Sequence, residues 1–295
     1  MWQNLPEHQT SGLSLHEYHD KCLDGTMLWE TYLRKGSPFC DDTIEQIFSA
    51  LIKIFSSVRV KGNTMIQMSL HPIIHYNFPA CEYFTEIIVG TATDRSFREL
   101  EKWWKNEANA IDMSHIAQFV CEGEGNRETG IEKQNILRRK VKNILKYDIT
   151  KSNPFSPVVL PQVDCLMLSH CLEMHALNKE DFCSALKNAS SLLKPGGDLI
   201  MVVAIETTFY MVGKFKFPHL CFDVDFLRKP LTDNGYFVEE LKVLPRKAVG
   251  LIDVCDYSAY LVLKAHKEAE GLLSDKRTSV RENSEGLGHG SDFFL

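Results

Sequence analysis

The sequence predicts an α/β protein with a doubly wound, mostly parallel sheet and an antiparallel pair of strands at one edge. Short apolar runs alternate with amphipathic helical patterns along the chain, as strands and covering helices do in such folds. LIMVVAI (199–205) is apolar throughout, which is typical of a central parallel strand. FVEELKVLP (237–245) and YSAYLVLKA (257–265) supply the expected antiparallel pair.

Four elements are predicted in the first third of the chain. Residues 42–56, DTIEQIFSALIKIFS, place apolar side chains at helical spacing and predict an amphipathic helix. TMIQM (64–68) and EIIVGT (86–91) predict strands. SFRELEKWWK (96–105) predicts the helix that follows them.

The middle of the chain continues this alternation. Residues 131–145 predict a single charged amphipathic helix, and VDCLMLSH (163–170) predicts a buried strand. Residues 179–193 predict another helix. The sequence KPGG follows it, and we expect Gly196 and Gly197 to supply a left-handed cap there.

Changes in composition divide the chain into three parts. Residues 1–20 are polar and rich in histidine, which predicts a flexible N-terminus. Residues 21–267 form the predicted domain, and 268–295 a disordered tail without periodicity. The tail ends in DFFL, either a docking motif or simply a frayed end.

Composition also excludes several classes of protein. The formal net charge of −6 argues against nucleic-acid binding, which calls for a basic face. No apolar run reaches the roughly 18 residues of a membrane span, and the N-terminus lacks a signal-peptide pattern. None of the nine cysteines, Cys81 and Cys171 among them, forms a CxxC pair, which favours core or free thiols over nucleophiles. We therefore expect a cytoplasmic, monomeric protein.

A longer set of motifs gives a resemblance to a known family. The turn KPGG after a strand that opens with Asp164 recurs in S-adenosylmethionine-dependent methyltransferases. From about residue 30 to 267 the chain resembles the nicotinamide, indolethylamine and phenylethanolamine N-methyltransferases. The matching segments are GSP (36–38), ELEKWWKNE (99–107), CEGEGN (121–126), ILKYDIT (144–150), LPQVDC (160–165), ALKNASSLLKPGGDL (185–199) and FYMVGKFKF (209–217). The resemblance implies a Rossmann-like methyltransferase sheet, an N-terminal helical lid, S-adenosylmethionine as cofactor and a pocket for a small amine.

The segment that matches the methyl-donor loop departs from the family pattern. Relatives have a sequence close to DIGSGPT where this chain has QMSLHPI (67–73). Gln67 replaces the acid, and Ser69 and His71 replace the two glycines. Only glycine lets a backbone approach a ligand without a Cβ clash, so both side chains are expected to enter the volume of the cofactor's amino-acid end.

The ribose and lid positions also differ. The acid that accepts the ribose hydroxyls falls on Thr91, and the polar position after it falls on Ser96. A threonine loses the charge assistance that a carboxylate gives. Asp94 offers a compensating acid, although it can equally be a solvated loop residue.

Of the family's tyrosines around the donor, one remains. Tyr32 matches a lid tyrosine, whereas its partners there fall on Met27 and Thr31. The tyrosine after the donor loop becomes His75. These losses weaken the predicted lid over the carboxylate and the sulfonium.

Other family positions are kept. Asp148 and Ile149 match the residues that meet the adenine, although Asp148 can also cap a strand end. Tyr210 and Val203 match positions of the acceptor pocket, and Val203 stands where the nicotinamide enzyme has an acid. Transfer of a methyl group needs in-line positioning more than a base, so no catalytic residue is assigned.

Two further groups of polar residues leave their roles open. His71 and His75 lie four apart, but Pro72 between them and the lack of an acid favour a structural role over metal binding. Glu173 and His175 follow a predicted strand and either reach a pocket or remain polar loop residues.

Two hypotheses follow for the function. The first is a small-molecule N-methyltransferase whose donor binding is weak or lost. The second is a catalytically inactive pseudo-methyltransferase that serves as a binding or regulatory protein.

Overall fold

A seven-stranded sheet in the order β3-β2-β1-β4-β5-β9-β8 organises the chain. The structure is a computed structural model and describes residues 13–37, 39, 44–57, 60–247 and 250–269. The predicted tail from residue 270 onward, with its DFFL motif, lies outside the described residues. The strands are β1 (Gly62–Ser69), β2 (Phe84–Thr91), β3 (Val141–Lys146), β4 (Val163–Ser169), β5 (Leu193–Ile205), β8 (Tyr236–Pro245) and β9 (Ala259–Lys267).

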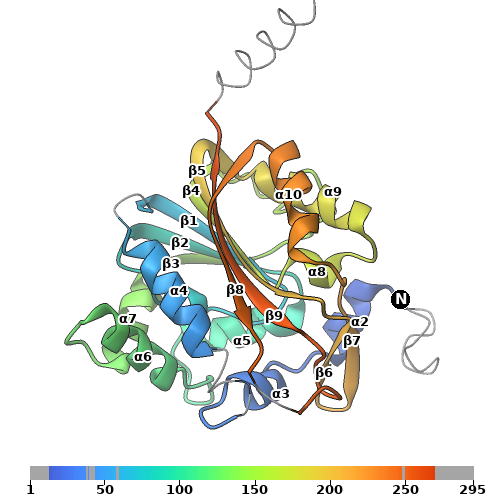
Figure 1. Cartoon of the computed structure of the whole chain (residues 1–295). Helices are drawn as coiled ribbons and strands as arrows, with labels where there is room; N and C mark the ends of the chain where they lie inside the picture. Colours follow the sequence, from blue (N-terminus) through green and yellow to red (C-terminus); the bar gives the residue numbers. More distant parts are fainter. Residues whose placement is uncertain (1–12, 38, 40–43, 58–59, 248–249, 270–295) are drawn as a thin grey trace, which may run out of the picture.

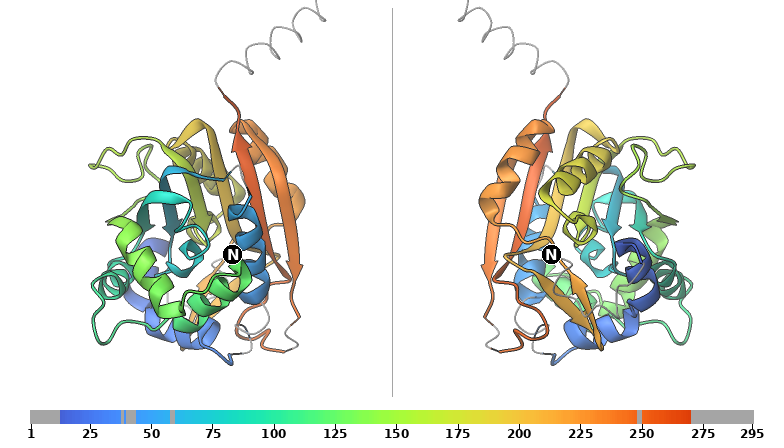
Figure 2. Two further views of the ribbon diagram at one scale, coloured as in Figure 1. Left: turned by 90° about the vertical axis from the view of Figure 1, so that its left-hand side faces the viewer. Right: turned by 90° about the vertical axis from the view of Figure 1, so that its right-hand side faces the viewer.

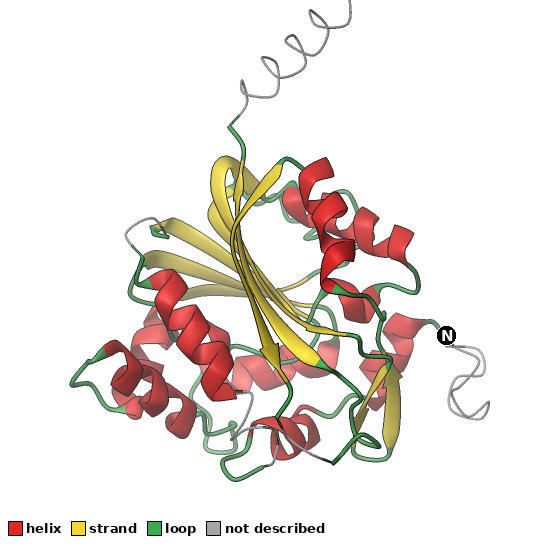
Figure 3. Ribbon diagram, in the orientation of Figure 1, coloured by secondary structure: helices red, strands yellow, loops and turns green. Residues whose placement is uncertain are grey.

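Helices cover both faces of this sheet (Figures 1 and 3). None of the described helices combines the length and the apolar composition that crossing a membrane requires. The helices are α2 (Leu15–Cys22), α3 (Gly25–Leu28), the π-helix η2 (Trp29–Leu33), α4 (Glu45–Phe55), the 3-10 helix η4 (His75–Asn77), α5 (Asp94–Trp104), α6 (Ser114–Glu124), α7 (Gly130–Lys140), α8 (Leu172–His175), α9 (Lys179–Ser190) and α10 (Val224–Asp233).

The predicted doubly wound sheet with an antiparallel edge pair is confirmed. β1 to β5 pair in parallel, β9 pairs antiparallel with β5, and β8 follows β9 at the margin of the molecule (Figure 2). In the register of β1 and β2, Ser69 lies opposite Thr91 at the carboxyl ends of both strands. The segments that follow these strands therefore meet at one edge of the sheet, where α/β proteins bind ligands.

A small second sheet lies beside this edge. β6 (Phe209–Val212) and β7 (Phe215–Pro218) form an antiparallel hairpin. The N-terminal helix α2 lies against it in Figure 1, and the Tyr18 hydroxyl donates a 3.1 Å hydrogen bond to the Lys216 carbonyl. Helix and hairpin together cover the carboxyl ends of the strands, as the predicted lid requires.

The prediction of one helix over residues 131–145 is wrong in its second half. Helix α7 ends at Lys140, and the chain continues directly into β3. Val141 and Ile144 are buried in β3, which pairs with β2. A short amphipathic strand that follows a helix keeps apolar residues near helical spacing, so periodicity alone hid the boundary.

The predicted glycine cap after the next helix is also wrong. Helix α9 ends at Ser190, and KPGG lies within β5. Gly196 does adopt a left-handed conformation, with φ of +80°, inside an irregular stretch of that strand. A Cβ on Gly197 would lie 2.9 Å from the Asp164 carbonyl, so the glycines allow β5 to bend beside β4.

Residues 15–20 of the segment predicted to be flexible belong to helix α2. Ser14 caps α2, and a capping box with Glu17 fixes its first turn. Tyr18 and His19 are buried. Residues 1–12 lie outside the described part of the chain.

Candidate functional site

Two hollows lie at the carboxyl edge of the sheet. The first, called the crevice below, has a volume of about 750 Å³. Its walls come from the start of α2, the segment after β3, and α8 and α9. Its lining residues are Ser14, Leu15, His16, Ala92, Lys146, Tyr147, Asp148, Ile149, Thr150, Lys151, Ser156, His175, Ala176, Leu177, Asp181, Ser184, Ala185 and Asn188.

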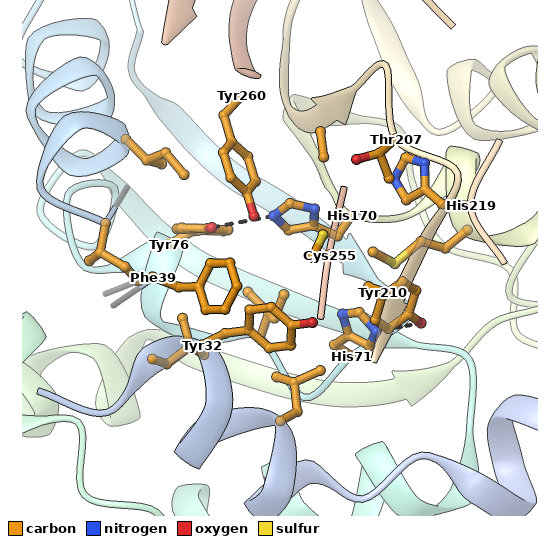
Figure 4. Close-up of a pocket in the computed structure, with 17 residues that line it drawn as sticks. Tyr32, Phe39, His71, Tyr76, His170, Thr207, Tyr210, His219, Cys255 and Tyr260 are labelled. Atoms are coloured by element: carbon orange, nitrogen blue, oxygen red, sulfur yellow. Dashed lines mark hydrogen bonds between the residues drawn. The ribbon is translucent and has the colours of Figure 1, made fainter. Parts of the chain in front are cut away.

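The second hollow, called the aromatic cavity, is smaller and is lined by more aromatic side chains (Figure 4). It leaves about 70 Å³ for the centres of water-sized molecules. The labelled side chains in Figure 4 come from η2 and the segment after it, the donor loop and η4, the ends of β4 and β5, the β6–β7 hairpin and its end, the loop before β9, and β9 itself. The cavity is lined by Leu28, Tyr32, Leu33, Phe39, Ile44, Ile47, His71, Ile73, Tyr76, His170, Met174, Ala204, Thr207, Tyr210, His219, Cys255 and Tyr260.

A hydrogen-bonded trio, called the Tyr210 cluster, links the two hollows. The Tyr210 hydroxyl lies 3.0 Å from His71 Nε2 and 3.2 Å from His19 Nε2. Tyr210 and His71 line the cavity, while His19 belongs to α2, whose first residues line the crevice. The three side chains therefore join the lining of the cavity to the helix whose first residues line the crevice.

The positions of the protons in the Tyr210 cluster follow from the carbonyl that His19 contacts. His19 Nδ1 lies 2.8 Å from the Leu15 carbonyl, which can only accept, so Nδ1 carries the hydrogen. Burial lowers the pKa of His19 to about 3, so its ring is neutral and Nε2 accepts from the Tyr210 hydroxyl. His71, whose pKa burial holds well below its usual value, then donates from Nε2 to the Tyr210 oxygen. The hydrogen bonds of Tyr210 in this cluster are thus made within the protein.

The donor loop is folded into the core. Gln67 is fully buried, and its amide donates to Ser169 Oγ at 2.8 Å. Asn77 Nδ2 lies 3.4 Å from Gln67 Oε1, a weak contact. Gln67, which stands at the position of the family's cofactor-binding acid, therefore bonds to other side chains of this protein.

The two polar residues predicted to lie near the ribose contact the donor loop instead. Ser96 Oγ donates to the Leu70 carbonyl at 3.1 Å, and Thr91 Oγ1 lies 3.4 Å from it. Both are buried, and neither is part of the crevice lining. Ser69 Oγ is buried with no hydrogen-bond partner among the described residues.

His75 lies apart from both hollows. Its ring is fully buried near the rings of Trp29, Phe48 and Tyr76, and neither ring nitrogen has a hydrogen-bond partner within the described residues. Burial lowers its pKa to about 3. It faces no cofactor volume, which makes its role that of a core residue.

Replacing this histidine tests that role. His75→Phe is expected to stabilise the fold by about 1–3 kcal/mol, because it removes two buried polar atoms that lack partners and keeps a ring of similar size. Urea unfolding at pH 7.5 measures this. A variant less stable than the parent would show that the imidazole has a polar partner after all.

The structure places the two residues predicted for the acceptor pocket differently. Tyr210 lines the aromatic cavity, whereas Val203 is buried in β5 and is not among the lining residues; its neighbour Ala204 is. Side chains alternate along a strand, so a shift of one residue changes the face. Tyr32, predicted for the cofactor, lines this cavity too, and its hydroxyl donates to the Met211 carbonyl at 2.8 Å.

Asp148 and Ile149, the residues predicted to meet the adenine, both line the crevice. Asp148 Oδ1 also accepts from the Thr150 amide at 3.1 Å and from its hydroxyl at 2.6 Å, so it shapes its own turn. Burial raises the pKa of this carboxyl, but the Thr150 bonds outweigh that and leave it below its usual value. The carboxylate is charged and ready to accept further hydrogen bonds.

Two histidines of the aromatic cavity, His170 and His219, face a buried acid that is not itself part of the lining. Glu173 is fully buried, with Oε1 3.7 Å from His170 Nδ1 and 4.0 Å from His219 Nε2. Burial raises its pKa to about 8, although backbone amides of Cys171 and Glu173 oppose this. The sequence pointed to Glu173 but to neither histidine, since His170 and His219 each follow a strand without a motif around them.

No group of three or more His, Cys, Asp or Glu side chains in the described part of the chain is arranged to hold a metal ion. The cysteines described there, including Cys81 and Cys171, are free and do not form disulfides.

Comparison with known proteins identifies relatives over most of the chain. The sequence model of the "NNMT/PNMT/TEMT family" matches residues 12–268. Nicotinamide N-methyltransferase of Sus scrofa is 40% identical over 204 residues, 69% of this chain and 77% of the relative. The human protein of that name is 37% identical over 217 residues, 73% of this chain and 82% of the relative. Indolethylamine N-methyltransferase of Oryctolagus cuniculus is 37% identical over 196 residues, 66% of this chain and 74% of the relative.

The fold agrees with more distant solved structures. Magnesium protoporphyrin IX methyltransferase from Synechocystis PCC 6803 with bound S-adenosylmethionine superposes with a TM-score of 0.56 at 11% identity, covering 88% of this chain and all of that one. At that identity the likeness concerns the Rossmann-like methyltransferase fold. With the family match across residues 12–268 and relatives at up to 40% identity, the chain belongs to the NNMT/PNMT/TEMT family of methyltransferases.

Proposed function

We propose that this chain is a small-amine N-methyltransferase by family whose binding of S-adenosylmethionine is weak or lost. The observation that carries the proposal is the donor loop, in which His71 bonds to Tyr210 and Gln67 bonds to Ser169, so that both side chains are occupied within the protein. Methyl transfer requires donor and acceptor to meet in line at close range, and these hollows hold the two partners in this proposal. In this proposal the Tyr210 cluster, whose three side chains bond to one another, opposes that meeting.

The cofactor fits one half of the site better than the other. The crevice offers Asp148 and Ile149 to the adenine and space for the ribose. The methionine end requires glycine backbone and an acid, whereas the loop supplies His71 and a self-paired Gln67. Loss of two charged hydrogen bonds, at Gln67 and Thr91, costs about 1.5–3 kcal/mol each, or roughly two to four orders of magnitude in affinity.

The aromatic cavity supports a small amine as its occupant. Rings line its sides, and its lining includes the imidazoles of His170 and His219, which in turn face the buried Glu173. An ammonium group donates up to three hydrogen bonds, and its charge favours the carboxylate form of Glu173 behind these rings. The alternative, a binding or regulatory protein without methyl transfer, is favoured by the same self-paired donor loop.

Calorimetric titration of the full chain with S-adenosylmethionine tests the proposal. We expect a dissociation constant of about 100 μM or weaker, two orders of magnitude above a low-micromolar site. The same protein is assayed for methyl transfer to nicotinamide, indolethylamine and phenylethanolamine, with low or no turnover expected. A low-micromolar constant would rule out weak donor binding. The monomeric and cytoplasmic state expected from the sequence stays a prediction.

Glu173→Gln separates the acid's two effects. The fold holds Glu173 protonated below a pKa of about 8, while the unfolded chain releases the proton near pH 4.5, so this group costs stability as pH rises between those values. At pH 8 the variant is therefore expected to be more stable by a few kcal/mol, on the order of the shift. Urea unfolding at pH 5 and pH 8 measures this, and equal gains at both would contradict it. Binding of phenylethanolamine is expected to weaken about tenfold or more, since the carboxylate partner is lost.

A further inference from the structure

Strand β8 forms the outer edge of the seven-stranded sheet, since β9 is the strand with which it pairs (Figure 2). It has ten residues, whereas β3 at the opposite edge has six. Within the described part of the chain no strand lies against its outer side, so the backbone N–H and C=O groups along that side lack strand partners. Such an edge can accept a further strand.

Two residues in the middle of β8 present these unpaired backbone groups. The amide of Arg246, which follows β8, donates to the Ser258 carbonyl at 2.9 Å on the side of β9. Backbone groups point in alternate directions along a strand, so those of Lys242 also face β9. Those of Leu241 and Val243 face the open side. Each of these two residues therefore offers a donor and an acceptor to a neighbouring strand.

The side chains of this stretch separate into an apolar face and a charged face. Leu241 and Val243 are 36% and 42% exposed on the first face. Glu240 and Lys242 lie on the other face, where Lys242 borders a hollow beside α4. Neither of these two charged groups forms an ion pair within the described residues. Both are therefore available to a partner that brings opposite charges.

A second copy of β8 brings such charges in one particular register. In an antiparallel pair, residues directly opposite each other lie on the same face, so a two-fold axis must pass beside one residue of the strand. With the axis at Leu241, Glu240 of each copy lies opposite Lys242 of the other. An axis at Glu240 or at Lys242 puts like charges opposite each other. An axis at Val243 places Lys242 opposite Leu244. Of these four positions, Leu241 alone pairs both charges.

We propose that β8 pairs antiparallel with β8 of a second copy of this chain, about a two-fold axis at Leu241. The two copies of Leu241 exchange their outward backbone hydrogen bonds. Each Leu241 side chain packs diagonally against Val243 of the other copy, and an ion pair between Glu240 and Lys242 lies on each side of the centre.

The strand itself limits the length of this pairing. The register shift between Val238 and Glu240 ends the regular ladder on one side, and Pro245, which has no amide hydrogen, ends it on the other. The interface is therefore small, and we expect a dimer with a dissociation constant of roughly 10–100 μM. This dimer replaces the monomer expected from composition. It is independent of donor binding, because neither Leu241 nor Val243 lines the crevice or the aromatic cavity.

Analytical ultracentrifugation of the full chain tests the pairing. Sedimentation is measured from about 5 to 300 μM protein in about 50 mM salt, where ion pairs are little screened. Glu240→Lys and Lys242→Glu are each expected to weaken the dimer about tenfold or more, because the two-fold axis turns one reversal into two repulsive contacts. The double variant that carries both changes is expected to regain the parent's dissociation constant within about threefold, since opposite charges face each other again.

Mixing the two single variants gives a sharper test. When one chain carries Glu240→Lys and the other Lys242→Glu, both facing pairs are again opposite in charge, so the mixture is expected to dimerise more tightly than either variant alone. Lys142→Glu is the matched control: this lysine lies on β3 at the opposite edge of the sheet, its side chain is 61% exposed, and no change in the dimer is expected. Thermal melting of each variant verifies folding.

Each outcome bears on the pairing. A parent chain that remains monomeric at about 300 μM would overturn it and leave the edge of β8 to a partner of another kind. A dimer that both single reversals leave intact would also overturn it, because a different surface would then join the copies. If Glu240→Lys weakens the dimer and Lys242→Glu does not, the axis at Leu241 is wrong. Loss in both single variants, with recovery in the double variant and in the mixture, supports the proposal.

Discussion

Changing Gln67, Ser69, His71 and Thr91 together to Asp, Gly, Gly and Asp is expected to raise the affinity for S-adenosylmethionine by roughly two to four orders of magnitude. The glycines remove the His71 imidazole from Tyr210 and free the loop backbone for close approach. The carboxylates restore two charged hydrogen bonds. Calorimetric titration of the parent and the variant measures the difference.

The free variant is expected to be less stable than the parent. Gln67 and Thr91 are fully buried, so the new carboxylates are unpaired until the donor arrives. Added S-adenosylmethionine should recover the loss in thermal melting, by linkage. Two partial variants separate the causes: Ser69→Gly with His71→Gly restores space, and Gln67→Asp with Thr91→Asp restores charge. A folded fourfold variant that still ignores the donor would show that the loop is not the limiting defect.

Mild acid is expected to unfold this protein. Buried histidines with lowered pKa values are neutral in the fold, whereas in the unfolded chain they take up protons near pH 6.5. The unfolded state then binds more protons, so stability falls as pH drops below about 6.5 and goes on falling toward the folded pKa values. The histidines concerned are His19, His71, His75, His170, His175 and His219.

The size of the effect follows from their number. At pH 5 each contributes a loss of about 2 kcal/mol, so the group approaches the roughly 5–15 kcal/mol stability of a typical domain. Glu173, protonated in the fold up to a pKa of about 8, works in the opposite direction and offsets about one histidine. Urea unfolding at pH 7.5 and pH 5 measures the sum.

Two variants serve as controls for the acid effect. His75→Phe is expected to recover about 2 kcal/mol of the difference between the two pH values, because one buried site is removed. Val159→Ala is expected to recover none, since this exposed side chain binds no proton. An unchanged urea midpoint between pH 7.5 and pH 5 would contradict the assignment of neutral, buried histidines.

Much of the fold followed from local patterns. β1, β2, β4, β5 and the antiparallel pair were predicted because apolar strands in this class are short and continuous. The boundary at Lys140 was missed because α7 and β3 follow each other without a turn. Helix α6 was not predicted as an element, although part of it belongs to the family motif CEGEGN.

The site was predictable only where a motif marked it. Asp148 and Ile149 could be found because the motif that contains them also contains the end of β3. Both residues line the crevice. The pairing of His19 with Tyr210 spans 191 residues, and no local pattern connects them. Likewise, Glu173 meets His219 only because the β6–β7 hairpin folds back over the end of β4. Such long-range contacts depend on tertiary packing rather than on spacing.

The docking of α2 separates two kinds of stability within one chain. Its contacts to the hairpin, Tyr18 to Lys216 and His19 to Tyr210, join segments at opposite ends of the sequence, whereas β1 is held on both sides by the sheet. The helix can therefore detach in a local opening that leaves the sheet intact. In hydrogen exchange, the protection of the α2 amides then reports whether this helix is docked on the hairpin. The β1 amides exchange only when the whole domain unfolds.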